Sequence, residues 1–249
     1  MDSSFHLIFS VPPAEAEQLR QREGLLAPPA YRIGPGPSLQ RIQAVPDLRG
    51  GILTVTDGGA SLTGNPQYLC RQVQREAAAR RVMGVWLDLQ RRPMQEAKRC
   101  LAALDGAVNQ AGLELWVPEW CAEAAPHGNV LISSALSGGS LKARLEDAVT
   151  AYGLPRVTLA VEPMAEDFTL PATDGQGRPL AQEELQTLLG TRRPNVFYSG
   201  ELCAHYFTFL QQGMPHFILF DNAGSVREKL ALARQLSLRF AVVPWEYAP

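Results

Sequence analysis

The segment Arg81–Pro93, RVMGVWLDLQRRP, has the composition of a buried strand that ends in polar side chains. Residues 83–89 are almost wholly apolar, as is typical of strands that are covered on both faces of a sheet. Asp88 and Gln90 lie two residues apart at its carboxyl end, so in a strand their side chains point to the same side. A carboxylate and an amide directed at one place after an apolar strand indicate a polar site.

Seven further segments have the composition of strands, at residues 5–11, 39–45, 51–57, 113–118, 129–135, 156–163 and 239–245. Helical patterns lie between most of them, at residues 14–26, 65–82, 94–112, 141–153 and 225–238. The last helix opens with the capping-box spacing Ser225-x-x-Glu228. This alternation predicts a parallel sheet, and eight strands in 249 residues predict a (β/α)8 barrel. An open doubly wound sheet usually has a glycine-rich loop after its first strand, and residues 9–17 contain no glycine.

Residues 164–222 interrupt the alternation and are too long for a simple linker. They contain a helical segment at 181–190 and strand-like segments at 195–199 and 204–210. We therefore expect one barrel domain over residues 1–249, with a small α+β subdomain inserted between its seventh strand and its last helix. The aromatic residues of the insertion fit either a docking surface or the subdomain's own core; they are Phe197, Tyr198, Tyr206, Phe207 and Phe209.

The composition is that of a soluble globular protein, with 46% hydrophobic residues and a net charge of -2. The near-neutral charge gives no electrostatic reason to expect nucleic-acid binding. No apolar run approaches the ~20 residues of a membrane span, and the N-terminal stretch lacks the basic region of a signal peptide. These features predict a protein without a membrane partner, in the cytoplasm. The four cysteines and four histidines show no metal-ligand spacing, so we expect buried thiols, no metal and no cofactor. The oligomeric state stays open.

Polar residues gather at the predicted carboxyl ends of the strands, where barrels of this class place their active sites. They are Asp57, Asp88, Gln90, Glu119, Ser133, Ser134, Glu162 and Glu246. Four tryptophans lie in or just after the same strands, namely Trp86, Trp116, Trp120 and Trp245. Carboxylates and indoles around one opening suit a sugar, because an indole offers a flat apolar face to a pyranose ring. The alternative is that the tryptophans pack the core.

From about residue 50 to its end, the chain resembles the family 18 glycoside hydrolases, the chitinase-like barrels. It looks closest to the branch that contains bacterial spore peptidoglycan-lytic enzymes. The similar segments are ILTVTDGG (52–59) at the third strand, MGVWLDLQ (83–90) at the fourth, PRVTLAVEPMAEDFTLP (155–171) at the seventh, and residues 219–247 at the last helix and strand. MGVWLDLQ falls on the family's D-G-x-D-x-D-x-E signature. The resemblance implies a barrel that acts on, or binds, amino sugars, and it adds a spore compartment as a second expected location.

The signature is only partly kept. Its three aspartates fall on Met83, Trp86 and Asp88, and its final glutamate falls on Gln90. The resemblance implies that Asp88 orients the N-acetyl group of the substrate, which attacks in a substrate-assisted mechanism. It also implies that Gln90 occupies the position of the general acid.

Two further positions follow from the resemblance. The family's sixth-strand tyrosine would fall near Ser133 or Ser134, where this chain has no tyrosine. Trp245 falls where the family has the tryptophan floor of the sugar pocket, and Glu246 follows it.

An amide cannot deliver a proton to a leaving group, and general acid catalysis is typically worth about 10²–10⁴-fold. We therefore expect a family-18-like pseudoenzyme that binds an amino sugar or peptidoglycan fragment with little or no hydrolase activity. Two alternatives stay open. One is an active glycosidase that uses Glu119, Glu162 and Asp88 as its carboxylates. The other is a structural or interaction protein that docks through the insertion. Whether the chain is an enzyme is therefore not decided by its sequence.

Overall fold

The structure is a computed structural model that describes residues 5–19, 23–44, 47–57, 64–89, 95–172 and 175–247. Gln90 lies outside these residues. The chain forms two compact units, each described by itself below. The first, the barrel unit, comprises residues 1–132, 148–160 and 237–248, and the second unit comprises residues 133–147 and 161–236.

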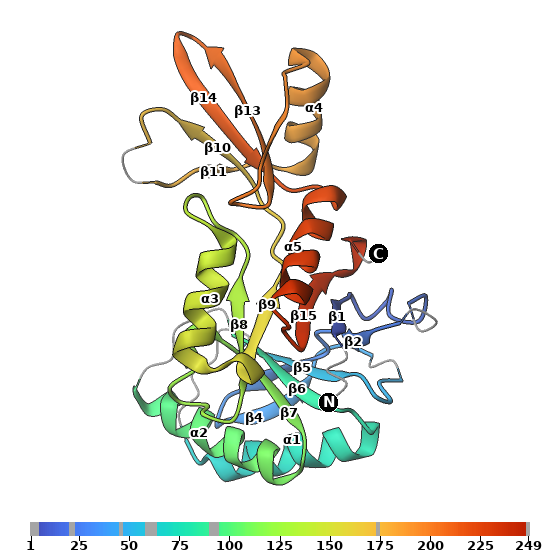
Figure 1. Cartoon of the computed structure of the whole chain (residues 1–249). Helices are drawn as coiled ribbons and strands as arrows, with labels where there is room; N and C mark the ends of the chain where they lie inside the picture. Colours follow the sequence, from blue (N-terminus) through green and yellow to red (C-terminus); the bar gives the residue numbers. More distant parts are fainter. Residues whose placement is uncertain are drawn as a thin grey trace. The chain divides into compact units, whose positions relative to one another are not determined.

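The barrel is built on one curled, mainly parallel sheet (Figure 1). Its strands are β1 (His6–Ser10), β2 (Leu25–Ala27), β3 (Tyr31–Gly34), β4 (Ser38–Arg41), β5 (Ile52–Thr56), β6 (Gly84–Asp88), β7 (Glu114–Pro118), β8 (Asn129–Ser133), β9 (Val157–Ala160) and β15 (Phe240–Pro244). They follow the order β2-β1-β15-β9-β8-β7-β6-β5-β3-β4, in which β3 and β4 pair antiparallel. The predicted (β/α)8 barrel class is confirmed.

The second barrel strand is split in two. β2 pairs with β1, and β3, which starts four residues after β2 ends, pairs with β5 on the other side of the sheet order. Pro28 and Pro29 lie between β2 and β3 and lack the N–H groups that a continuous ladder needs. Together β2 and β3 therefore bridge the two ends of the parallel sheet.

In this region one sequence prediction is wrong and another is met only in part. Of the predicted helix 14–26, residues 14–19 form turns, in which the Glu15 N–H donates to the Pro12 carbonyl, and Leu25 and Leu26 belong to β2; residues 20–22 lie outside the described residues. Strand pairing with β1 outweighs the helical pattern there. The predicted strand 39–45 yields only β4, which folds back on β3 and takes no place of its own in the parallel order.

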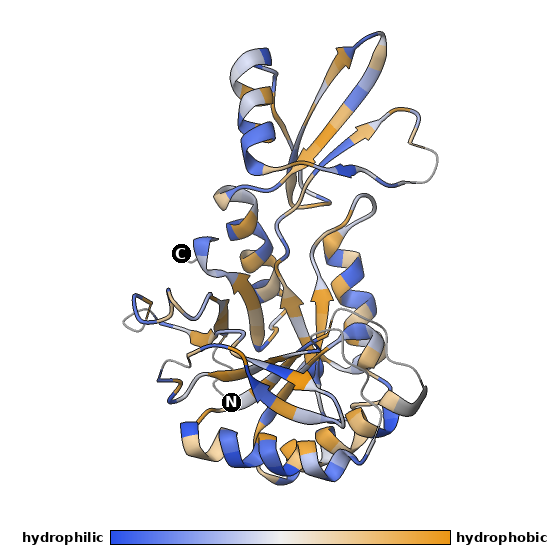
Figure 2. Cartoon of the chain, turned by 180° about the vertical axis from the view of Figure 1, so that it is seen from behind, coloured by the Kyte–Doolittle hydropathy of each residue, from blue (hydrophilic) through white to orange (hydrophobic). Residues whose placement is uncertain are grey.

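The helices outside the inserted sheet are α1 (Pro66–Arg80), α2 (Gln95–Gln110), α3 (Leu141–Tyr152) and α5 (Ala223–Gln235), with short 3-10 turns η1 (Glu119–Cys121), η2 (Leu154–Arg156) and η3 (Trp245–Tyr247). α1 and α2 pack on the outer faces of β5, β6 and β7, where Leu69, Leu101 and Leu87 are among the buried residues. Figure 2 shows the resulting hydropathy pattern, with largely apolar strands beside helices of mixed colour. None of the described helices is long and apolar enough to cross a membrane.

The last helix begins earlier than predicted. Asn222, not Ser225, is its N-cap, and the Asn222 Oδ1 accepts hydrogen bonds from the N–H groups of Gly224 (2.7 Å) and Ser225 (3.1 Å). Ser225 is instead the third helical residue of the capping box, and its Oγ accepts a hydrogen bond from the Asn222 N–H at 2.9 Å. Asparagine is as good an N-cap residue as serine, so this sequence allows a helix start at either position, and the helix takes the earlier one.

Within the second unit, residues 165–220 form an antiparallel sheet with one helix. The sheet order is β11-β10-β14-β13-β12, formed by β10 (Ala165–Thr169), β11 (Arg178–Pro179), β12 (Phe197–Ser199), β13 (Ala204–Gln211) and β14 (Met214–Phe220). α4 (Gln182–Arg192) covers one face, where Leu185 packs with Phe207 and Ile218. This is the α+β insertion between the seventh barrel strand and the last helix.

All four cysteines are free and buried, as the sequence predicts. Burial raises the pKa of the Cys100 thiol to about 11 and that of the Cys121 thiol to about 12. Since the thiolate is the reactive form, we expect both thiols to react with a disulfide reagent at pH 8 at least about a hundredfold more slowly than an exposed cysteine, and Cys121 more slowly than Cys100. Thiol titration with and without denaturant measures this. Rapid reaction of Cys100 or Cys121 in the folded protein would contradict it.

Candidate functional site

In the barrel unit, two acids end neighbouring strands. Asp88 is the last residue of β6 and lies opposite Thr56 of β5, and Asp57 follows Thr56 directly. Val85 and Leu87 pack on the helix side of the sheet, so Asp88, which alternates with them, faces the barrel interior. Asp57 is buried and Asp88 is half-buried. The carboxyl end of the barrel thus carries two adjacent carboxylates.

Below Asp88, a row of inward-facing residues crosses three strands, with Thr54, Trp86 and Trp116 in register. Trp116 is fully buried and lies edge-on to Phe240, with ring centroids 5.1 Å apart. This places Trp116 in the packed core of the barrel. Trp86 is only partly buried, and its indole Nε1 has no partner among the described residues.

Glu119 begins η1 directly after β7. Its carboxylate accepts a hydrogen bond from the Tyr152 hydroxyl of α3 at 3.3 Å. The next residue, Trp120, packs against the cluster between the sheet and helices α1 and α2. Glu119 is thus held at a strand end, whereas Trp120 contributes to the outer layer.

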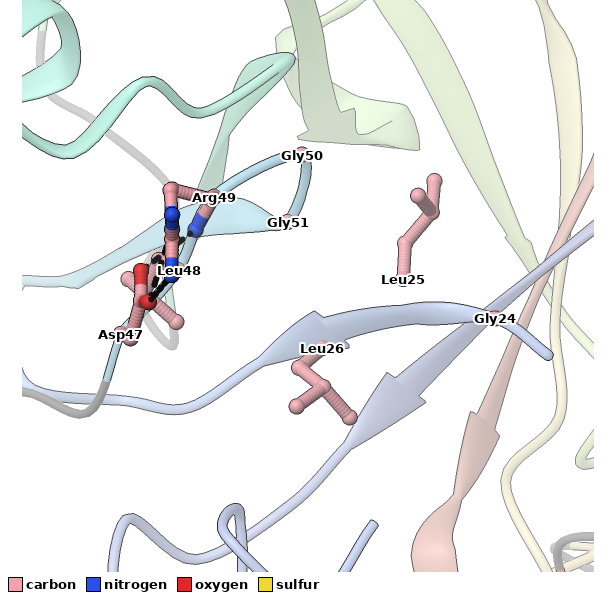
Figure 3. Close-up of a pocket in the computed structure, with 8 residues that line it drawn as sticks. All are labelled: Gly24, Leu25, Leu26, Asp47, Leu48, Arg49, Gly50 and Gly51. Atoms are coloured by element: carbon pink, nitrogen blue, oxygen red, sulfur yellow. Dashed lines mark hydrogen bonds and ion pairs between the residues drawn. The ribbon is translucent and has the colours of Figure 1, made fainter. Parts of the chain in front are cut away.

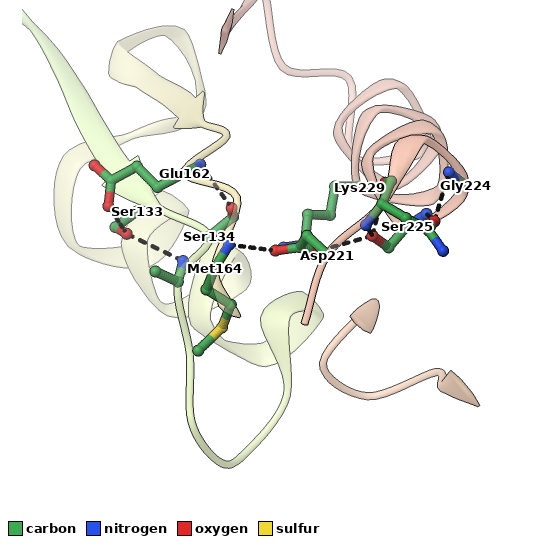
Figure 4. A network of polar contacts seen from close by, with 10 residues as sticks. Ser133, Ser134, Glu162, Met164, Asp221, Gly224, Ser225 and Lys229 are labelled. Carbon is green, nitrogen blue, oxygen red and sulfur yellow. Dashed lines mark hydrogen bonds and ion pairs between the residues drawn. The ribbon is translucent and has the colours of Figure 1, made fainter. Parts of the chain in front are cut away.

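In the second unit, three predicted site residues meet (Figure 4). The Ser133 Oγ donates to the Glu162 carboxylate at 2.5 Å and accepts from the Ala135 N–H at 3.1 Å. The Ser134 Oγ accepts from the Glu162 N–H at 3.1 Å. Among the described residues the Glu162 carboxylate is bonded to a serine and forms no ion pair.

A buried charge network in the same unit was not predicted (Figure 4). The Asp221 and Lys229 side chains are fully buried and lie 2.7 Å apart. Asp221 also accepts from the Ser225 hydroxyl (2.7 Å) and the Met164 N–H (3.0 Å). The spacing Asp221, Ser225, Lys229 repeats every four residues, which places one side chain above another at the start of a helix. That spacing is the signal that could have revealed the network.

Trp245 and Glu246 lie in η3, after the last strand. Trp245 packs against the cluster of Phe9 and Leu26, and Phe9 lies on β1 next to the inward-facing Ile8. The indole Nε1 of Trp245 is buried without a partner among the described residues. Its role as the floor of a sugar pocket stays a prediction, as does the role of Gln90.

The cavity drawn in Figure 3 lies elsewhere, at the amino ends of β2 and β5. It has a volume of about 450 Å³, and the exposed ion pair of Asp47 and Arg49 lines it at 2.7 Å. Barrels of this class place their sites at the opposite, carboxyl ends of the strands. Within the described ranges, no three His, Cys, Asp or Glu side chains gather closely enough to hold a metal ion.

No protein-family model matches the chain, and no curated protein matches it. Solved structures do. A chitinase from Chromobacterium violaceum aligns with a TM-score of 0.71 and 15% identity, over 99% of this chain and 96% of that one. The Bacillus cereus spore cortex-lytic enzyme SleL aligns with a TM-score of 0.70 and 12% identity, over 98% of this chain and 72% of that one.

A third solved structure is a class V chitinase from Nicotiana tobaccum, a glutamate-to-glutamine variant in complex with NAG4. It aligns with a TM-score of 0.69 and 11% identity, over 99% of this chain and 95% of that one. A family 18 N-acetylglucosaminidase from Paenibacillus barengoltzii also matches. At these identities the likeness is one of fold. The chain has the barrel fold of the family 18 glycoside hydrolases, as the resemblance in its sequence implied.

Proposed function

We propose that this protein binds an N-acetylated glycan, either an amino-sugar oligomer or a peptidoglycan fragment, with little or no hydrolysis. One observation carries the proposal. In a barrel of the family 18 fold, the inward-facing end of β6 keeps a carboxylate, Asp88, beside a second one, Asp57. A carboxylate there can accept a hydrogen bond from the N–H of an acetamido group, and a charge-assisted bond of this kind is strong.

The loss of hydrolysis follows from Gln90, two residues after Asp88. A carboxamide has no proton to give at neutral pH, but it still offers both a donor and an acceptor to a sugar. The tobacco class V chitinase with glutamine in place of a glutamate is found in complex with NAG4. This supports glycan binding without the acid. The spore cortex-lytic neighbour supports a spore compartment as the location of this chain, with the cytoplasm as the alternative.

An active glycosidase is the second candidate, and two contacts favour it. Glu162 and Glu119 each accept a hydrogen bond from a neutral hydroxyl, on Ser133 and Tyr152 respectively. A hydroxyl donor can orient a carboxylate without neutralising its charge, as a glycosidase carboxylate requires. A retaining mechanism would further need two carboxyl groups about 5–5.5 Å apart.

Calorimetric titration with chitotetraose tests the binding proposal. We expect Asp88→Ala to weaken binding about tenfold or more, because a hydrogen bond to a charged group contributes about 1.5–3 kcal/mol. The matched control is Glu123→Ala, which removes an 86% exposed carboxylate from the same unit and should bind like the wild type. If neither chitotetraose nor a muropeptide binds, or if Asp88→Ala binds as well as the wild type, the proposal is wrong.

Hydrolysis separates the two candidates. With an N-acetylglucosaminide that has a fluorescent leaving group, we expect Gln90→Glu to hydrolyse the substrate about 10²-fold or more faster than the residual rate of the wild type. Wild-type hydrolysis that is lost in Glu162→Gln or Glu119→Gln would establish the active glycosidase instead. A Gln90→Glu variant that binds glycan but stays silent would show that more than the acid is missing.

A further inference from the structure

The inserted sheet ends in an apolar edge. Among the described strands β12 pairs only with β13, and the three consecutive side chains Val196, Phe197 and Tyr198 are 43%, 52% and 43% exposed. An edge strand with large exposed apolar side chains is a template for pairing with another strand, and proteins usually protect such edges with charge or proline. The three exposed residues 196–198 include neither a charged residue nor a proline.

The rings behind this edge form a stack across the sheet. Phe197 stacks on Tyr206 with centroids 5.5 Å apart and planes at 28°, and Tyr206 stacks on Phe217 at 5.3 Å and 27°. Tyr206 has a ring on each side and Phe217 also meets Phe168 at 6.1 Å, whereas the outer side of Phe197 meets no ring among the described residues. Phe207, by contrast, is buried under α4 in the subdomain's own core. The stack therefore lacks a ring at one end only.

We propose that β12 pairs antiparallel with β12 of a second copy of this chain, about a two-fold axis at Phe197. The two five-stranded sheets then become one sheet of ten, and the two Phe197 rings continue the stack. An isologous interface must be complementary to itself, so residues equally distant from the axis must match. Val196 meets Tyr198, both apolar, and Asn195 meets Ser199, both polar.

The charges at the ends of the edge agree with the antiparallel direction. Exposed Arg193 precedes the edge at one end and exposed Glu201 follows it at the other. In an antiparallel pair each end lies near the opposite end of the partner, so two pairs of opposite charges result. A parallel pair would bring like charges together. The inference does not depend on glycan binding.

A sugar fits this surface less well than a second copy. The rings stack on one another, so they present edges and a single free face instead of a row of flat faces to pyranose rings. The paired edge is short, well below the ~1,000 Å² of a stable interface, so we expect a weak, concentration-dependent dimer.

Analytical ultracentrifugation of the full chain over a range of concentrations tests the dimer. We expect Phe197→Asp to weaken dimerisation about a hundredfold, as for a central aromatic contact. The control is Leu210→Asp, a 69% exposed apolar residue at the far end of β13, which should dimerise like the wild type. A wild type that stays monomeric at every concentration overturns the proposal, and so does a Leu210→Asp variant that loses the dimer while Phe197→Asp keeps it.

Charge reversal tests the direction of the pairing. Arg193→Glu and Glu201→Arg should each weaken the dimer about tenfold, because each creates two like-charge pairs across the interface. The double variant restores opposite charges at both ends and should dimerise like the wild type. A double variant that is weaker than both single variants would rule out the antiparallel arrangement. Circular dichroism confirms that each variant is folded.

Discussion

Replacing Lys229 by methionine is expected to destabilise the protein by about 3–5 kcal/mol. Lys229 and Asp221 are both fully buried, and the ammonium nitrogen lies 2.7 Å from the carboxylate. Methionine fills nearly the same volume but carries no charge, so the variant leaves the Asp221 carboxylate buried and unneutralised. Removing one partner of a buried pair costs much more than removing both.

Loss of this ion pair affects more than its immediate surroundings, because Asp221 also connects two segments of the chain. Its carboxylate accepts from the Met164 N–H, and its own N–H donates to the Met164 carbonyl at 2.8 Å. Met164 precedes the first strand of the inserted sheet and Asp221 follows the last. One carboxylate therefore ties together the two points where the chain enters and leaves that sheet, and Lys229 neutralises it.

Urea unfolding of three proteins measures the effect: wild type, Lys229→Met, and the double variant Lys229→Met/Asp221→Asn. The asparagine of the double variant keeps an oxygen for the Met164 N–H but carries no charge. We expect it to recover most of the loss. A single variant within about 1 kcal/mol of the wild type would contradict the prediction, and a double variant no better than the single one would show that the unpaired charge is not the cause.

Most barrel strands could be predicted because their signal is local. β5, β6 and β15 are short apolar runs, as expected where both faces of a sheet are covered. The second strand could not be predicted because it is defined by its pairing with β1 and β5, which the local sequence does not show. β2 has three residues, and only its alignment with β1 and the Pro28–Pro29 break before β3 reveal it as a strand.

For the site residues, too, local features could be predicted from the sequence and long-range contacts could not. The alternation of side chains along β6 is enough to turn Asp88 inward, and the structure agrees. The contact of Ser133 with Glu162 spans 29 positions in the sequence and depends on how the two strand ends meet. The extent of burial could not be predicted either: Trp86 and Trp116 face the same interior, but of the two only Trp116 is fully buried.

Trp116 also explains the glycine of the family-like signature. A methyl group on Gly84 would lie 2.5 Å from the Glu114 carbonyl oxygen and 2.5 Å from the Trp116 ring. The ring could turn only within a packed barrel interior, and the carbonyl belongs to the neighbouring strand β7. We therefore expect Gly84→Ala to destabilise the protein by about 3 kcal/mol, as in overpacked cores.

Gly106 supplies the matched control, because the same substitution there meets open space. It lies within α2, and a methyl group on it has no heavy atom within 4 Å. Alanine in a helix is better than glycine by about 0.5–1 kcal/mol, so Gly106→Ala should raise the free energy of unfolding by that amount. Thermal and urea unfolding of both variants give opposite signs if the clash, and not the loss of glycine itself, governs Gly84. Equal and small effects at both positions would mean that β6 and β7 can move apart, and the end of β6 that carries Asp88 would then be less rigid than its packing implies.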